Sequence, residues 1–242
     1  NRKCEDQMVL LIKFGKKEHL EQLKNGIVHF SPIELFQEDP TDFRGDKMEG
    51  KHYIDTSKPF LINGTDISMY IKEAVVSYEL NCPVCSFSAS LLSYNNCHMV
   101  SGGEYAPNDD FIAEMKKFGD YFLVFNAFDF IDSLAKEFEI TGCGYEYHPV
   151  VYIDKHNHEL VRGYFDTKSE DQKSTAHLFV KDTMNSYPLQ NEWRMIFLDH
   201  SNHYRLNGTS GINLRTDFST QMPIFSTDQL GTLRCTKEYL YK

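Results

Sequence analysis

One segment near the C-terminal end, residues 187–197 (YPLQNEWRMIF), constrains the fold more than any other part of the chain. It predicts the entry to a buried strand, and on an extended chain residues i and i+2 point to the same face. Gln190 and Glu192 are therefore expected to face one cleft, with Trp193 and Met195 packed on the other side. The alternative interpretation is an edge strand on which both polar side chains are solvated.

Composition favours a sheet-rich fold. The chain has 242 residues, of which 41% are hydrophobic, and it contains 18 Phe and 14 Tyr. This length suits one large domain or two small ones, and aromatic side chains fit pleated surfaces. The net charge of −10 argues against a general polyanion binder, although a local basic patch remains open.

The sequence contains no apolar run of about 18 residues, so we expect no membrane partner. No signal-peptide pattern is visible at its start, and six Cys do not make a disulfide scaffold. A cytoplasmic location is the prediction that follows.

Hydrophobic periodicity predicts strands mixed with helices. Strands are expected at residues 8–14, 27–30, 71–80, 84–88, 121–126, 146–153, 160–165, 192–198 and 212–214. Helices are expected at residues 17–25, 109–118, 128–138 and 176–185, with a further short helix capped by Ser31 and a loop at 101–108. No linker or repeat divides the chain. We predict a single α+β domain over residues 1–242, with a split mixed or antiparallel sheet and flanking helices.

Residues 39–50 form a charged, glycine-punctuated stretch without periodicity. A loop of this length in a compact domain is often functional. Arg44 and Lys47 supply positive charge here, so we expect the loop to lie over a binding site, against the alternative of a solvated surface loop.

The cysteines and histidines leave several interpretations open. Cys82, Cys85, Cys97 and His98 are four soft ligands of the kind that tetrahedral zinc takes. Cys97 and His98 are adjacent, however, which disfavours both reaching one metal, and a redox pair or buried free thiols are the alternatives. We expect no metal. No Gly-x-Ser-x-Gly, P-loop or His-Glu-x-x-His pattern occurs, which disfavours serine hydrolases, P-loop phosphotransferases and zincins.

Three separated motifs fit one scheme: the opening strand with Lys13, the Ser86-x-Ser88 strand, and the Gln190-x-Glu192 turn. This combination resembles the ADP-ribosyltransferase-like superfamily. The chain also resembles a group of uncharacterised bacterial proteins that open with an apolar strand and a helix ending Asn-Gly, and that close with Gln-Asn-Glu-Trp/Phe-Arg.

The resemblance implies a role for each motif. Glu192 matches the glutamate that binds the nicotinamide ribose and stabilises an oxocarbenium-like transition state, and Gln190 matches the residue that orients the acceptor. In the branch of the superfamily that has the Ser-x-Ser strand and the Gln-x-Glu turn, an Arg usually stands at the position of Lys13. Lys cannot make the same bidentate contact with a phosphate, so Arg44 is the alternative candidate for this role. The implied cofactor-binding residues are Lys13, Phe14, Ser31, Arg44, Ser86 and Ser88.

The sequence therefore predicts an NAD-dependent ADP-ribosyltransferase that modifies a nucleic acid or a protein, in the manner of a bacterial toxin or phage-defence effector. For such an effector, an antitoxin or chaperone is a plausible partner. One alternative is a non-enzymatic module of the same fold that binds a nucleotide or a partner, in which Glu192 would be buried in a salt bridge with Arg194 or another strand. The other is a nuclease with Asp46, Glu49 and Glu192 around Mg²⁺.

Overall fold

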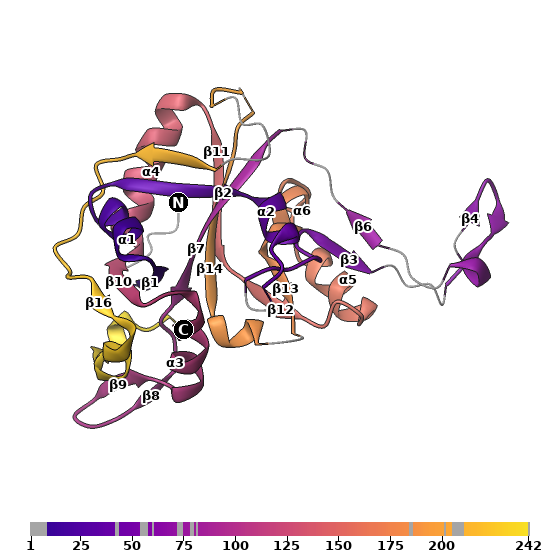
Figure 1. The fold of residues 1–242 in the computed structure, drawn as a ribbon. Coiled ribbons are helices and arrows are strands. Elements are labelled where there is room, and N and C mark those ends of the chain that lie inside the picture. The colour runs from indigo at the N-terminus through magenta and orange to yellow at the C-terminus, as the bar shows by residue number, and fades with distance from the viewer. Residues whose placement is uncertain are drawn as a thin grey trace.

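The computed structural model describes residues 9–41, 44–53, 58–59, 61–71, 75–77, 80, 82–183, 186–200, 202–204 and 211–241. Within these residues an antiparallel sheet of eight strands forms the centre of the molecule (Figure 1). Six strands follow the order β11-β14-β7-β1-β10-β16, and β2 also pairs with β7 and carries β15. They are β1 (Leu10–Gly15), β2 (Ile27–Pro32), β7 (Val84–Leu91), β10 (Tyr121–Asn126), β11 (Gly144–Pro149), β14 (Glu192–Leu198), β15 (Ile212–Arg215) and β16 (Phe225–Ser226).

The sheet divides at β7. One end of this strand pairs with β1, where Ile12 lies opposite Ser90, and the other end pairs with β2, where Ser31 lies opposite Ser86. Between the two pairings, Lys13 Nζ donates a hydrogen bond of 2.5 Å to the Ser88 carbonyl oxygen. A lysine side chain thus satisfies a backbone acceptor at the point where β1 and β2 separate.

One face of the sheet packs against two helices, α1 (Lys17–Lys24) and α4 (Ala127–Thr141). Alternate residues of a strand share a face, and Trp193, Met195 and Phe197 all point into this first core cluster. The two helices contribute Leu20, Leu23, Phe130, Leu134 and Phe138, which recur at helical spacing. These side chains fix the orientation of β14, so its other residues must face the opposite side.

The opposite face carries two smaller apolar clusters. The second core cluster joins Phe14 of β1 to Phe111 of α3 (Asp109–Met115), and the third joins Ile196 to Leu178. Polar side chains on this face contact each cluster. Ser90 Oγ contacts Met115 Sδ of the second cluster at 3.6 Å, and Arg194 Nη1 donates to the carbonyl of Leu178 in the third cluster at 2.5 Å. Glu192 lies on this polar part of the sheet.

Short elements surround the main sheet. The remaining helices are α2 (Ile33–Glu38), α5 (His158–Asp166), α6 (Glu170–Ala176) and the 3-10 turns η1 (Ser68–Tyr70), η2 (Lys116–Phe118), η3 (His177–Phe179), η4 (Tyr187–Gln190), η5 (Thr227–Thr232) and η6 (Lys237–Tyr239). The remaining strands are β3 (Lys51–Tyr53), β4 (Leu61–Ile62), β5 (Thr65–Asp66), β6 (Val75–Ser77), β8 (Cys97–Met99), β9 (Glu104–Pro107), β12 (Val151–Ile153), β13 (Val180–Asp182) and β17 (Cys235–Thr236). Of these, β12 and β13 form a parallel pair.

The predicted mixture of helices and antiparallel strands is confirmed, but several elements were predicted wrongly. Residues 160–165 belong to α5 rather than a strand, because Asn157 Oδ1 caps the helix by accepting from the Leu160 amide. The helix predicted at 176–185 is not one helix over its described residues, 176–183: η3 leads into β13, which is buried along its whole length. The strand predicted at 146–153 breaks after Pro149 into β11 and β12.

Two local predictions also fail, one near the start of the chain and one near its middle. Ser31 does not cap α2, since it lies in β2 and the residue before the helix is Pro32. Residues 101–108 include the strand β9, which pairs with β8 and β17. Ser31 pairs with the distant strand β7, and β9 pairs both with the nearby β8 and with the distant β17.

Candidate functional site

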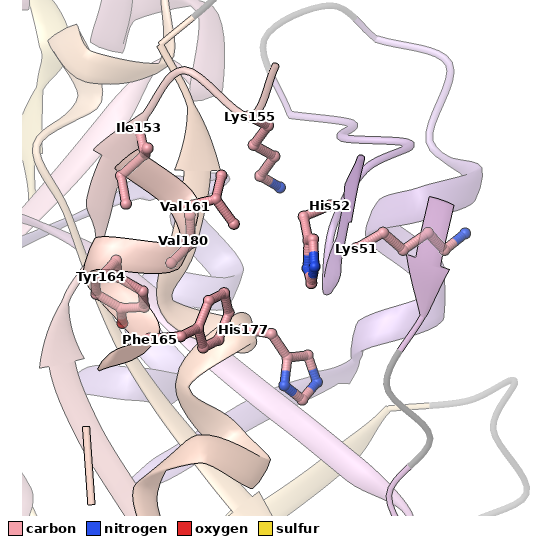
Figure 2. A pocket seen from close by; sticks show the side chains of 9 residues that line it. All are labelled: Lys51, His52, Ile153, Lys155, Val161, Tyr164, Phe165, His177 and Val180. Atoms are coloured by element: carbon pink, nitrogen blue, oxygen red, sulfur yellow. The ribbon is translucent and has the colours of Figure 1, made fainter. Parts of the chain in front are cut away.

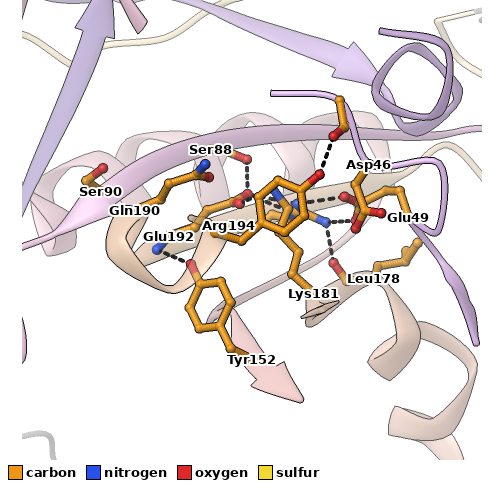
Figure 3. Close-up of polar contacts among 12 residues, drawn as sticks. Asp46, Glu49, Ser88, Ser90, Tyr152, Leu178, Lys181, Gln190, Glu192 and Arg194 are labelled. Atoms are coloured by element: carbon orange, nitrogen blue, oxygen red, sulfur yellow. Dashed lines mark hydrogen bonds and ion pairs between the residues drawn. The ribbon is translucent and has the colours of Figure 1, made fainter. Parts of the chain in front are cut away.

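Glu192 opens β14 and lies directly beside the serine residues of β7. Ser88 Oγ donates a hydrogen bond of 2.6 Å to Glu192 Oε1, and Ser90 is the residue opposite Glu192 in the ladder (Figure 3). The strand β7 lies between β14 and β1, so the three motif strands are neighbours, as we expected. Since β14 itself lies between β11 and β7, the interpretation of an edge strand is wrong.

Two cations hold the Glu192 carboxylate. Lys181 Nζ lies 2.7 Å from Oε2, and Arg194 donates to Oε1 from both Nε at 3.0 Å and Nη2 at 2.8 Å. Arg194 also contacts both carboxylate oxygens of Glu49. Glu192 is 7% exposed and Arg194 only 1%. Figure 3 shows these side chains converging from β14, β13 and the loop after α2. This buried salt bridge is the contact that we expected for a non-enzymatic module.

The ion pairs control the protonation state of Glu192. Burial alone would raise its pKa, but the nearby charges of Arg194 and Lys181 and the hydrogen bonds from Lys181 and Ser88 lower the pKa below its usual range. The glutamate is therefore a carboxylate at neutral pH. Burial raises the pKa of Tyr152, whose hydroxyl accepts a hydrogen bond of 2.8 Å from the Glu192 amide.

Gln190 does not occupy the position that the i, i+2 argument assigned to it. It ends η4, and the next residue, Asn191, has a positive φ of 44°. The extended geometry begins only at Glu192, so the two side chains are not aligned by a common strand. Gln190 is 4% exposed, and its Nε2 donates to Glu114 Oε1 at 3.4 Å. The interpretation as a solvated side chain is thus wrong.

The loop after α2 packs against this cluster, as far as it is described. Tyr187 donates from its hydroxyl to the Gly45 carbonyl at 2.5 Å, and Lys155 Nζ donates to the Met48 carbonyl at 2.6 Å. Glu49 is fully buried where it meets Arg194. The described part of the loop is therefore anchored against the Glu192 cluster, while Arg44 and Lys47 are exposed.

The other residues assigned to the cofactor pocket have different surroundings. Lys13 Nζ lies 4.6 Å from the centre of the Phe87 ring. The pKa of Lys13 is lowered to about 8, mainly by burial; the charge of Glu192 raises this pKa and the charge of Arg44 lowers it. Arg44 is exposed and close enough to Lys13 to affect its pKa. Ser31 and Ser86 lie opposite each other in the β2–β7 pairing, and Ser86 shares its face with Ser88.

Phe14 belongs to the second core cluster, where its ring packs against Phe111 and Phe122. Its side chain is buried in this cluster, on the same face of the sheet as Glu192.

Sequence reasoning missed Lys181 and gave no role to Tyr152. The Glu192-x-Arg194 spacing is a signal for the contact with Arg194, because both residues point to the same face of a strand. Lys181 offered no such signal, since residues 176–185 were expected to be helical.

Two cavities lie near the cluster, and Glu192 lines neither of them. The smaller has a volume of about 10 Å³ and lies among β3, β12, α5, η3 and β13 (Figure 2). That volume holds at most one water molecule. The larger, about 240 Å³, lies between β11 and α6.

The described residues contain no group of three or more His, Cys, Asp or Glu side chains that could hold a metal ion. Of the proposed zinc ligands, Cys85 lies in the first core cluster and Cys97 in the second. Glu49 and Glu192 do converge, as the nuclease hypothesis requires, but the Arg194 guanidinium lies between them.

Comparison with protein-family models, with curated proteins and with solved structures finds no match to this chain. In the part of the chain that the structure describes, no helix is both long and apolar enough to cross a membrane.

Proposed function

We propose that the chain is an NAD-dependent ADP-ribosyltransferase that modifies a macromolecular acceptor, either a nucleic acid or a protein. The observation that carries the proposal is the hydrogen bond of 2.6 Å from Ser88 to Glu192 across neighbouring strands. Lys13 completes the arrangement from β1, on the other side of β7. The three motifs that suggested the superfamily thus come together on adjacent strands, although they are far apart in sequence.

The reaction makes modest demands on acid–base groups. The bond between nicotinamide and the ribose breaks, nicotinamide leaves as a neutral molecule with the bonding electron pair, and positive charge develops on the ribose. The acceptor then bonds to the same ribose carbon and loses its proton. A carboxylate held near the developing charge stabilises the transition state. Glu192 is such a carboxylate, because its lowered pKa keeps it ionised at neutral pH.

The ion pairs of Glu192 also favour a second candidate, the non-enzymatic module. A carboxylate already neutralised by Lys181 and Arg194 has little charge to offer an oxocarbenium ion. In this alternative the same face binds a nucleotide or a protein partner, and the cluster serves only to hold β14, β13 and the loop after α2 together. The two candidates predict the same fold and differ in whether NAD is cleaved.

The test measures nicotinamide released from NAD by the purified chain and by three variants: Glu192→Gln, Gln190→Ala and Glu139→Gln. Glu139 is exposed on α4, which makes its variant a matched control. We expect Glu192→Gln to lower the rate at least about 100-fold at equal folded fraction, and the control to leave it unchanged. Gln190→Ala is expected to preserve NAD hydrolysis while labelling of an acceptor falls.

The outcomes separate the candidates. Saturable NAD binding without nicotinamide release would support the non-enzymatic module and refute the transferase. Release that survives in folded Glu192→Gln would assign the chemistry to another residue. Absence of both binding and release would refute NAD as the ligand.

A further inference from the structure

The larger cavity is separate from the Glu192 carboxylate and has features of a small ligand site. Its volume is about 240 Å³. Sites for drug-sized ligands usually start near 300 Å³. This volume suits a single- or fused-ring compound.

Aromatic side chains make up much of the wall. Tyr164, His148, Phe179 and Tyr241 all line the cavity, and His148 packs edge-on against Phe179 with ring centres 5.1 Å apart. Burial lowers the pKa of His148, so its imidazole is neutral at pH 7. Flat, uncharged walls of this kind favour a planar ligand that stacks.

Two charged groups of opposite sign line the same cavity. Thr175 Oγ1 donates to Glu146 Oε2 at 2.8 Å and so orients the carboxylate. Lys168 Nζ lies 4.4 Å from the centre of the Tyr164 ring, and the Tyr164 hydroxyl donates to the Ala176 carbonyl at 3.2 Å. Tyr164 thus positions the ammonium group and is itself fixed to α6. The cavity offers a strong acceptor at Glu146 and a strong donor at Lys168.

We propose that this cavity binds a single guanine-type nucleobase. The carboxylate of Glu146 accepts from the adjacent ring N–H and exocyclic amino group, Lys168 donates to the carbonyl oxygen, and the exposed ring of Tyr241 or His148 stacks on the base. Adenine lacks the carbonyl, and uracil offers only one N–H between two carbonyls, so neither satisfies both charged groups as well. The proposal does not depend on NAD cleavage at Glu192.

The experiment is a calorimetric titration of the intact chain with guanosine, inosine and adenosine. Inosine keeps the carbonyl and the ring N–H but lacks the amino group. We expect guanosine to bind saturably and inosine to bind about tenfold more weakly or worse, since one hydrogen bond to a charged acceptor is lost. Adenosine is expected to show no saturable binding.

Two variants and one control locate the site. Glu146→Gln is expected to lower guanosine affinity about tenfold or more, and to reduce the difference between guanosine and inosine. Lys168→Met is expected to weaken both nucleosides equally, because both carry the carbonyl. Lys136→Met, at an exposed lysine of α4, is the matched control and should change neither affinity.

Three results would overturn the proposal. The first is the absence of saturable guanosine binding up to about 1 mM, since a dissociation constant of that size corresponds to only about 4 kcal/mol of binding free energy. The second is equal affinity for guanosine and adenosine. The third is an unchanged guanosine affinity in both cavity variants when they are folded. Loss of NAD cleavage in the separate assay would leave this test unaffected.

Discussion

The buried cluster around Arg194 predicts that Glu192→Gln destabilises the fold. Two carboxylates, Glu49 and Glu192, balance two cations, Arg194 and Lys181, and all four are at most 7% exposed. Removing the charge of Glu192 leaves one positive charge in excess among buried groups. Breaking a buried ion pair by removing one partner typically costs about 3–5 kcal/mol. We expect a loss of that size in the free energy of unfolding, which a domain of ordinary stability survives.

The measurement is urea unfolding followed by the fluorescence of Trp193, the only tryptophan, which is 4% exposed in the first core cluster. The double variant Lys181→Met/Glu192→Gln restores charge balance between Glu49 and Arg194. It is expected to be more stable than the sum of the single changes predicts, by about 0.5–3 kcal/mol. Glu139→Gln is again the control and should stay near the wild-type value.

The pH dependence gives an independent check on the same residue. The pKa of Glu192 is lower in the folded protein than its ordinary value, so its contribution to stability is present above the unfolded-state pKa and is lost as pH falls through the folded-state value. The loss begins below about pH 4.5. Glu192→Gln should therefore show a flatter acid limb than wild type. A variant within about 1 kcal/mol of wild type, with no coupling to Lys181, would refute the electrostatic reasoning.

Three further predictions concern stability. Burial lowers the pKa of His177 to about 4, so this residue binds less proton in the folded protein than in the unfolded chain below about pH 6.5. His177 alone should therefore cost wild type about 2 kcal/mol of stability between pH 8 and pH 5. Between these pH values His177→Phe should lose about 2 kcal/mol less than wild type, and the exposed-site control His19→Gln should lose as much as wild type, as judged by urea unfolding at both pH values. An equal loss in His177→Phe and wild type would contradict the assignment. Lys13→Met removes the donor to the Ser88 carbonyl and should lower the free energy of unfolding by about 1–3 kcal/mol. The exposed control Lys16→Met should lower it little. Equal stability of the two variants would disprove a stabilising role for the hydrogen bond from Lys13. A Cβ on Gly45 would lie 1.9 Å from the Asp39 carbonyl oxygen, so Gly45→Ala should lower the melting temperature. The control Gly163→Ala, on α5, places its Cβ in open space and should leave the melting temperature unchanged. An unchanged melting temperature for Gly45→Ala would show that the loop can shift to accommodate the methyl group.

The strands with strong local patterns were predictable from the sequence. The bounds of β10 and β14 agree with the predicted residues 121–126 and 192–198, because their apolar runs end at polar residues. Residues 160–165 were predicted wrongly because Leu160, Val161, Tyr164 and Phe165 form short apolar pairs that suit a strand in isolation. Their spacing of four residues is equally that of a helix, and the Asn157 cap decides between the two.

The candidate site was only partly predictable. The contact between Ser88 and Glu192 followed from the resemblance to a superfamily, while no local signal places Glu49 in the interior. Its loop is charged and aperiodic, which is typical of surface segments, and its partner Arg194 lies 145 residues further along the chain. A charged residue is buried when a paired charge compensates its desolvation, and that partner is set by the tertiary structure.

The cations around Glu192 also determine what the transferase hypothesis requires. Arg194 is held by Glu49 and the Leu178 carbonyl in addition to Glu192, so turning it away would break contacts on three elements. Lys181 Nζ contacts Glu192 Oε2 and lies 5.2 Å from the centre of the Tyr187 ring. A diphosphate carries the negative charge needed to draw an ammonium group away from a carboxylate. In a transferase, Lys181 is therefore the cation that would exchange Glu192 for the diphosphate, leaving Arg194 to hold Oε1 while Oε2 meets the ribose. In a non-enzymatic module, both cations keep their contacts with Glu192 when the ligand binds.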